Sequence, residues 1–266
     1  MARRMRLDTE LVRRGLARSR EQAADLITAG RVAVSGQTAA KPATQVGLDA
    51  AIAVRDPAGE PDYASRGGRK LAGALIAFAD LAVAGRRCLD VGASTGGFTD
   101  VLRRAGAAHV VAVDVGYGQL AWSLRTDSRV TVLDRVNVRQ LTPGQVAPAP
   151  ALVTADLSFI SLALVLPALV DAAAPDADFV LLVKPQFEVG KGKVGAGGVV
   201  RDPERRAAAV ASVAAAAAAA GLGVRGVTAS PLPGPAGNVE YFLWLHRDAP
   251  PLDLQALSRA IEEGPQ

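Results

Sequence analysis

The chain has 266 residues, half of them hydrophobic and about a fifth charged, and a formal net charge of +4. These values are ordinary for a globular protein with one large domain and a smaller part. No apolar segment follows the basic N-terminus, and the longest uncharged run, residues 207–224, is too rich in alanine for a membrane helix. The single cysteine, Cys88, excludes an internal disulfide and fits a reducing compartment, so we expect a cytoplasmic protein.

Positive charge is concentrated near the N-terminus. Residues 1–70 hold 13 basic and 8 acidic residues, whereas the other 196 residues hold 17 and 18. This excess is typical of a polyanion-binding module attached to a near-neutral domain. A solvated basic face would give the same balance, so charge alone does not decide between them.

Residues 7–54 predict a small module of two helices and short strands. Asp8 is expected to cap a helix that ends at Gly15, and Ser19 begins a capping box for a helix over residues 20–29. The sequences RVAVSGQT and AIAV predict short strands. Few aromatic residues are present, which favours arginine contacts to phosphate and recognition of RNA shape over base stacking. The residues expected to bind RNA are Arg3, Arg4, Arg6, Arg14, Arg18, Arg20 and, at the start of the next domain, Arg66.

The segment after this module has two prolines, one glycine and no apolar period, which predicts a linker. We therefore expect an RNA-binding domain over residues 1–56, a linker over 57–65 and a second domain over 66–266.

The second domain alternates helices with buried Val- and Leu-rich strands, which predicts an α/β fold with a mostly parallel seven-stranded sheet. The last two strands are joined by a loop too short for a parallel crossover, so we expect an antiparallel hairpin at one edge. The predicted strands are residues 86–91, 109–115, 130–133, 151–156, 179–184, 224–230 and 239–245.

A glycine-rich loop follows the first of these strands, in the sequence CLDVGASTGGFTD. It does not have the G-x-G-x-x-G spacing and lacks the lysine of a P-loop, so a dinucleotide and a nucleoside triphosphate are poor matches. Asp90, Asp114, Asp134 and Asp156 come at or just after the ends of four successive strands. Because parallel strands end at one edge of a sheet, we expect these acids to lie around one pocket.

Such a ring of carboxylates would repel phosphate and attract a ligand with a ribose diol, an amino group and a positive centre. S-Adenosylmethionine has all three features. The alternative explanation of the pattern is a tight turn with incidental surface acids and no ligand. We expect Asp114 to accept the ribose hydroxyls, Val115 to lie against adenine, and Asp134 or Asn137 to bind the adenine edge. The expected cofactor-binding residues are Gly92, Ala93, Ser94, Thr95, Gly96, Gly97, Asp114, Val115, Asp134, Asn137 and Asp156.

Two lysines are candidates for catalysis, since only five of the 30 basic residues are lysine. Lys184 ends the fifth strand and Lys70 precedes the first helix of the second domain. Methyl transfer to a ribose 2′-hydroxyl needs a base, and a lysine can serve if burial and a nearby cation lower its pKa. Asp156 and Glu240 could orient the ammonium groups, although each residue alone could equally form an ordinary ion pair.

Several longer motifs resemble the TlyA family of ribosomal RNA methyltransferases: SRGGRKL, LDVGASTGGFTD, DVGYGQLAW, ADLSFIS, KPQFEVGKG and SPLPGPAGNVEYFLWL. The segment RLDTELVRRGLARSREQAADLITAGRVAVSG resembles the N-terminal S4 RNA-binding domain of that family. The resemblance implies an FtsJ-like, Rossmann-like class I methyltransferase that methylates cytidine 2′-hydroxyls in 16S ribosomal RNA, 23S ribosomal RNA or both. It also implies a link to capreomycin and viomycin susceptibility, and a catalytic tetrad of Lys70, Asp156, Lys184 and Glu240.

Two other functions are weighed against this one. The haemolysin name used in the family suggests a membrane-active protein. No segment is apolar enough to insert into a membrane, so we expect no stable membrane association. A non-catalytic RNA-binding protein could keep the same fold. The expected partners are ribosomal RNA or ribosomal subunits. His109 and His246 have no metal-ligand spacing, so no metal is expected.

Overall fold

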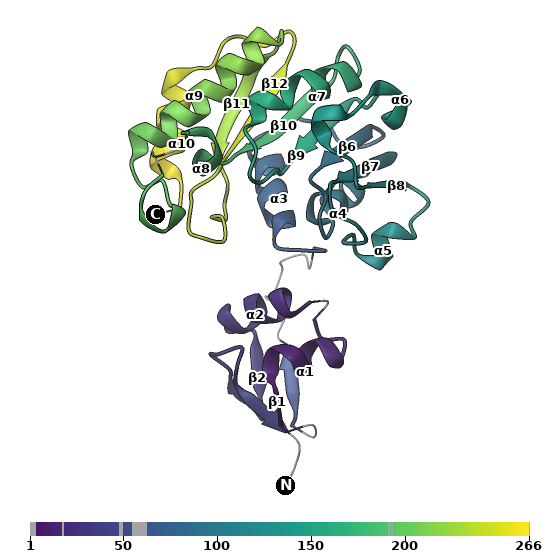
Figure 1. Cartoon of the computed structure of the whole chain (residues 1–266), viewed down its shortest axis with the longest axis vertical. Coiled ribbons are helices and arrows are strands. Elements are labelled where there is room, and N and C mark those ends of the chain that lie inside the picture. The colour runs from purple at the N-terminus through teal and green to yellow at the C-terminus, as the bar shows by residue number, and fades with distance from the viewer. Residues whose placement is uncertain are drawn as a thin grey trace. The chain divides into compact units, whose positions relative to one another are not determined.

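The computed structural model describes residues 4–17, 19–47, 50–54, 63–190, 192 and 194–265. The chain divides into two compact units, Met1–Ser65 and Arg66–Gln266 (Figure 1). Arg3 and Arg18, both predicted to bind RNA, lie outside the described residues.

The smaller unit packs two helices with short antiparallel strands. In one sheet β1 pairs with β4, and in the other β2 lies between β3 and β5. Leu7, Leu11, Ile27 and Val32 are each at most 1 % exposed and form its core. The elements are β1 (Arg4–Arg6), α1 (Leu7–Arg13), α2 (Arg20–Thr28), β2 (Val32–Val34), β3 (Gln37–Thr38), β4 (Gln45–Gly47) and β5 (Ile52–Val54).

The prediction that Asp8 caps the first helix is wrong. Helix α1 begins at Leu7, directly after β1, and its first amides donate to the backbone oxygens of Thr44 and Pro42, at 2.8 and 3.1 Å. Those carbonyls satisfy the amides that a side-chain cap would otherwise bind. By contrast, Ser19 does cap α2, because its side chain accepts a hydrogen bond from Gln22 N at 3.1 Å.

The larger unit contains the predicted seven-stranded sheet, in the order β11-β12-β10-β9-β6-β7-β8. Strand order reverses between β6 and β9, where ligands bind in doubly wound sheets. Strand β12 runs antiparallel to both of its neighbours, β10 and β11. The predicted antiparallel hairpin of the last two strands at one edge of the sheet is therefore confirmed. The strands are β6 (Arg87–Val91), β7 (His109–Asp114), β8 (Val130–Asp134), β9 (Leu152–Ala155), β10 (Asp178–Val183), β11 (Gly223–Ala229) and β12 (Tyr241–His246).

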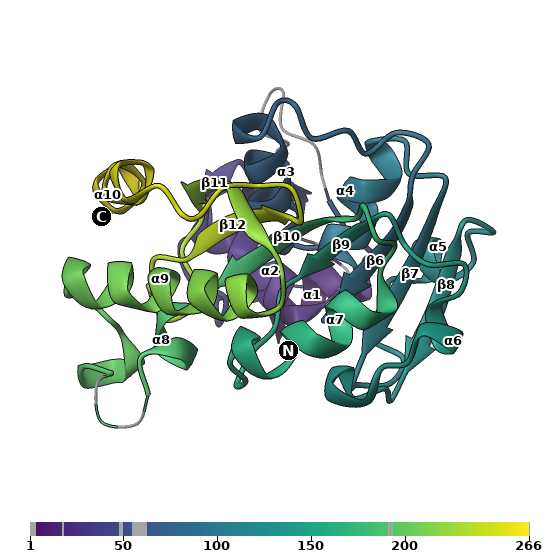
Figure 2. The same cartoon turned by 90° about the horizontal axis from the view of Figure 1, so that it is seen from above.

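Helices cover both faces of this sheet, with α7 and α9 on one side and α3 and α4 on the other (Figure 2). All six residues of β10 are buried, and the five after Asp178 form a continuous apolar run, FVLLV. The helices and turns are α3 (Gly67–Ala77), α4 (Gly97–Arg104), α5 (Trp122–Arg125), η1 (Val138–Gln140), α6 (Pro143–Val146), η2 (Leu162–Leu164), α7 (Leu166–Ala172), α8 (Pro185–Glu188), η3 (Ala196–Gly198), α9 (Pro203–Ala219) and α10 (Leu254–Glu263).

The alanine-rich segment forms helix α9, which packs against the sheet. Asp202 caps it by accepting a hydrogen bond from Glu204 N at 2.9 Å, and Pro203 occupies its first turn. Val210 and Val213 are buried in the core. Among the residues that the structure describes, no helix is long and apolar enough to cross a membrane.

Candidate active site

The glycine loop between β6 and α4 is shaped by contacts within the chain. Gly92 has φ +81°, and a Cβ there would lie 2.5 Å from the carbonyl oxygen of Asp156. Gly96 has φ +99°, and a Cβ there would lie 2.4 Å from the side chain of Leu124. Both positions therefore require glycine because neighbouring segments approach the loop closely, whether or not a ligand does.

Asp114 ties this loop to the end of β7. Its carboxylate accepts hydrogen bonds from Ser94 N at 2.8 Å and from Gly116 N at 2.6 Å. Gly92 N and Ala93 N in turn donate to the backbone oxygen of Val113. The loop thus follows the strand ends closely, and the carboxylate keeps lone pairs for further donors.

The next residues predicted to hold a cofactor lie at the ends of β7 and β8. Asp114 and Asp134 are paired in register on these two strands, and Val115 is 74 % exposed. Asp134 binds Arg125 Nη2 at 2.7 Å, and this hydrogen bond lowers the pKa of the Asp134 carboxyl. Asn137 caps the η1 turn by accepting from Arg139 N. Sequence reasoning missed the Arg125 partner, which comes from a separate helix.

Asp90 does not belong to the ring of acids, contrary to the sequence expectation. It lies inside β6, is fully buried, and accepts hydrogen bonds from the hydroxyls of Thr99 at 2.6 Å and Thr154 at 3.3 Å. Strand residues alternate between faces, so Asp90 points under α4 rather than to the edge. Burial raises the pKa of Asp90 to about 7, against the opposing effect of the two hydroxyls.

Two lysine–carboxylate pairs lie at the ends of β9, β10 and β12, one of them buried and the other partly exposed through Asp156. Lys184 Nζ is 2.6 Å from Asp156 Oδ1, and Lys70 Nζ is 2.5 Å from Glu240 Oε2. Lys70, Lys184 and Glu240 are all less than 9 % exposed. Each lysine therefore has its own carboxylate.

The sheet register explains how residues far apart in the chain meet here. Val183 pairs with Tyr241, so Lys184 and Glu240 come next on adjacent antiparallel strands. Strand β9 lies on the other side of β10 and ends just before Asp156. Lys70 reaches Glu240 from α3, 170 positions away in sequence.

The loop after β9 carries features that the sequence did not predict as part of the site. Lys184 Nζ donates to Ser158 Oγ at 3.0 Å. Phe159 is 91 % exposed, has φ +64°, and packs against Phe187 with ring centroids 5.2 Å apart. A large apolar side chain held in the left-handed region at a site edge is unusual. The motif ADLSFIS contains Phe159, but only the structure shows its exposure.

Glu188 holds this loop from α8. It accepts hydrogen bonds from Ser161 Oγ at 2.5 Å and from Leu162 N at 2.9 Å, and burial raises the pKa of its carboxyl. Three successive contacts therefore join the segment after β10 to the loop after β9, through Lys184, Phe187 and Glu188.

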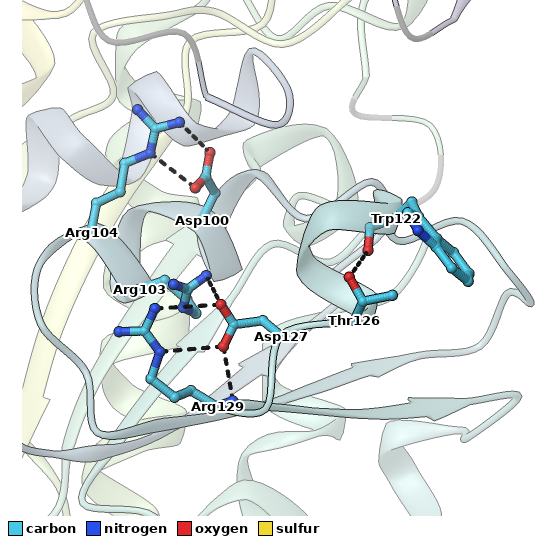
Figure 3. A network of polar contacts seen from close by, with 7 residues as sticks. All are labelled: Asp100, Arg103, Arg104, Trp122, Thr126, Asp127 and Arg129. Carbon is cyan, nitrogen blue, oxygen red and sulfur yellow. Dashed lines mark hydrogen bonds and ion pairs between the residues drawn. The ribbon is translucent and has the colours of Figure 1, made fainter.

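A polar network fixes the helix that follows the glycine loop (Figure 3). Asp127 lies between Arg103 of α4, at 2.7 Å, and Arg129 just before β8, at 3.2 Å. Asp100 and Arg104 form a further pair on α4, and Thr126 donates to the backbone oxygen of Trp122. The network holds the segment between α5 and β8 against α4.

In the smaller unit, several of the predicted RNA-binding arginines surround two buried acids. Arg6 and Arg20 bind Asp8, and Arg14 binds Glu10 together with Arg13. Arg4 is exposed on β1, and in the larger unit Arg66 is exposed at the start of α3.

A metal site is not evident among the described residues, where no three His, Cys, Asp or Glu side chains are grouped to hold an ion.

Comparison with known proteins identifies both units. Residues 63–247 match the family model of FtsJ-like methyltransferases, and residues 5–52 match the S4 domain. A Mycobacterium tuberculosis protein named 16S/23S rRNA (cytidine-2′-O)-methyltransferase TlyA is 63 % identical over the full length of both chains. The Bacillus subtilis protein named putative rRNA methyltransferase YqxC is 42 % identical, over 97 % of this chain and 93 % of the relative.

A solved structure extends this similarity to the fold of the whole chain. The structure described as a putative hemolysin from Streptococcus thermophilus is 36 % identical, covers 99 % of this chain and 98 % of its own, and superposes with a TM-score of 0.78. The chain therefore belongs to the TlyA family, in which an S4 domain precedes an FtsJ-like methyltransferase domain.

Proposed function

We propose that this protein transfers a methyl group from S-adenosylmethionine to the 2′-hydroxyl of a cytidine in 16S ribosomal RNA, 23S ribosomal RNA or both. The observation that carries the proposal is the two lysine–carboxylate ion pairs, Lys184–Asp156 and Lys70–Glu240, beside the glycine loop. The name of the Mycobacterium tuberculosis relative supports the choice of cytidine and of ribosomal RNA. Such a substrate would place the protein in the cytoplasm.

The loop residues 92–97 and the ends of β7 and β8 fit S-adenosylmethionine. Asp114 is oriented by two backbone amides and keeps lone pairs that can accept ribose hydroxyls. The exposed side chain of Val115 offers an apolar surface for adenine, and Asp134 and Asn137 are polar groups at the end of β8 and at the turn that follows it. Asp156 would face the positive sulfonium centre.

These four side chains, three of them buried and Asp156 partly exposed, can manage the proton of the attacking hydroxyl. When bound, S-adenosylmethionine supplies an electrophilic methyl group. Lys184 would have to give up its own proton first; as a neutral amine it would then receive the 2′-hydroxyl proton, while Asp156 holds its Nζ in place. Glu240 keeps one buried oxygen, Oε1, without a hydrogen-bond partner among the described residues, and its other oxygen fixes Lys70. The Oε1 atom can accept a hydrogen bond from the substrate, or its charge can stabilise the ammonium group of Lys70.

Phe159 offers a stacking surface for the target base. A nucleotide must leave its base stack for its 2′-hydroxyl to reach a recessed lysine, and unstacked bases commonly pack on exposed aromatic rings. Phe159 is exposed and lies one residue after Ser158, which binds the proposed base Lys184. We infer that Phe159 packs against the displaced base.

Transfer of tritiated methyl groups to purified ribosomal subunits tests the proposed activity. We expect stoichiometric labelling by the wild type and at least a 100-fold loss in Lys184→Ala and Asp156→Ala, since a positioned general base contributes about 10²–10⁴-fold. Lys41→Ala removes an exposed lysine and serves as the control. Full labelling by both active-site variants, with circular dichroism unchanged, would refute the assigned roles.

Mapping of 2′-O-methylation in cells with and without the protein would identify the nucleotide and the subunit. On the family resemblance, we expect cells without it to be less susceptible to capreomycin and viomycin. A protein that binds ribosomal subunits but neither S-adenosylmethionine nor methyl groups would instead be a non-catalytic RNA-binding factor.

A further inference from the structure

Asp8 is a buried carboxylate in a module with excess positive charge. Its side chain is 5 % exposed, and Arg6 binds both of its oxygens, Nε to Oδ1 at 3.1 Å and Nη2 to Oδ2 at 2.7 Å. Arg20 Nη2 binds the same Oδ2 at 3.1 Å. The backbone amide and hydroxyl of Thr9 both donate to Oδ1, so the carboxylate itself is held rigidly.

Stability alone does not account for this arrangement. The side chains of Arg6 and Arg20 are 44 % and 62 % exposed, and ion pairs of such exposed groups contribute little to stability because water screens them. Removing a carboxylate from water has an opposing cost. The acid is therefore buried while the positive groups that it binds stay largely in solvent.

The geometric effect of Asp8 is to hold two guanidinium groups together. Arg6 ends β1 and Arg20 begins α2, so the two residues come from separate elements. Their Nη2 atoms share one carboxylate oxygen and would otherwise repel each other. Each guanidinium has five N–H donors, so both keep donors for a phosphate after binding Asp8. Fixing them in advance lowers the entropy cost of binding a phosphate backbone.

We propose that Asp8 is a positioning residue for RNA binding, which orients Arg6 and Arg20 as a preformed pair toward the phosphates of ribosomal RNA. This role rests on the proposed function. It is assigned to an acid, although the RNA that the acid helps to bind is also negatively charged. Glu10 does not join separate elements in this way. Its partner Arg13 lies on the same helix, α1, and its partner Arg14 is the residue directly after that helix.

The substitution Asp8→Asn tests this role because two explanations predict opposite signs. Long-range electrostatics alone would make the module more positive, tighten binding to a polyanion and steepen its salt dependence. Loss of positioning should instead raise the dissociation constant for purified ribosomal subunits about 10-fold. The salt slope should also become shallower by about one for each phosphate that the arginines no longer neutralise. Equal or tighter binding by Asp8→Asn would overturn the inference.

Glu21→Gln is the matched control for charge. Glu21 is exposed in the first turn of α2, and no side-chain hydrogen bond or ion pair of Glu21 is found within the described residues. The substitution makes the same change in net charge without touching the arginine pair. We expect binding equal to or slightly tighter than that of the wild type.

A mutant cycle separates positioning from damage to the module. In an Arg6→Ala/Arg20→Ala background, Asp8→Asn should change the dissociation constant less than twofold, because its partners are gone. An undiminished 10-fold loss there would mean that Asp8 acts through folding, and would overturn the inference. A wild-type chain that fails to bind subunits would refute the proposed function as well, whereas wild-type binding unaffected by Asp8→Asn refutes this inference alone.

Discussion

The environment of Asp90 differs strongly from that of an ordinary surface acid. It has no exposed surface, and the side chains that donate to its carboxylate within the described residues are the hydroxyls of Thr99 and Thr154. Burial and the nearby charge of Asp156 both raise its pKa, to about 7 from an ordinary value of 3.8. Near pH 7 a substantial part of the folded population therefore carries a proton on Asp90.

This raised pKa predicts that the larger unit loses stability as pH rises from about 4 to 7. In that range the folded state holds a proton that the unfolded state has released, so the free energy of unfolding falls with pH. The full effect is roughly 4 kcal/mol at 1.36 kcal/mol per pKa unit, and it is constant above about pH 8. Asp90→Asn should flatten this dependence.

Urea unfolding followed by tryptophan fluorescence measures the effect. Both tryptophans, Trp122 and Trp244, belong to the larger unit, so the signal reports on that unit alone. Identical pH dependence in the wild type and in Asp90→Asn would contradict the assignment.

At the scale of elements, helix α8 and the loop after β9 form one connected wall of the site. Glu188 binds the loop at Ser161 and Leu162, and Phe187 packs on Phe159. The wall is therefore set by contacts between two strand-to-helix connections rather than by either connection alone.

We predict that Glu188→Ala impairs substrate binding more than cofactor binding. Loss of two hydrogen bonds to a carboxylate frees the loop, and Phe159 loses its fixed position. KM for ribosomal subunits should rise about 10-fold, while the dissociation constant for S-adenosylmethionine, measured by calorimetry, stays within twofold. Glu188→Gln keeps an acceptor for Leu162 N and should recover most of the activity. An unchanged KM in Glu188→Ala would contradict this role.

At the scale of the whole molecule, each of the two compact units has hydrophobic packing of its own. The core of the smaller unit centres on Leu7, Leu11 and Ile27, whereas one large core cluster of the larger unit lies between its sheet and helices α7 and α9. Units with separate cores can unfold separately.

Calorimetry should therefore resolve two thermal transitions, and S-adenosylmethionine should shift only that of the larger unit. At 100 times its dissociation constant a ligand adds about 2.7 kcal/mol, which corresponds to about 5–10 °C for a unit of this size. Tryptophan fluorescence identifies the larger unit, and Asp114→Ala should abolish the shift. A single transition, or equal shifts of both, would contradict the prediction.

The sheet was predictable because buried parallel strands have nearly continuous apolar sequences, as in β10. The hairpin was predictable because the loop between its strands is too short for a parallel crossover. The helix cap at Ser19 was predictable because its hydrogen-bond partner, Gln22 N, is only three positions away in sequence. The prediction failed at Asp8, where carbonyls of Pro42 and Thr44 replace the cap, and at Asp90, whose strand face is decided by packing. Both failures involve partners that are distant in the chain.

By itself, the sequence determined the order of elements, the glycine loop and which lysines and acids come at strand ends, because these depend on local periodicity and residue type. Only the tertiary structure decided that Lys184 binds Asp156 and Lys70 binds Glu240, and that Arg6 and Arg20 share Asp8. It also decided that Gly92 and Gly96 are required by the chain's own close approach. The physical reason is that hydrogen bonds, ion pairs and steric contacts act over a few ångströms in space, and folding alone brings residues 170 positions apart to that distance.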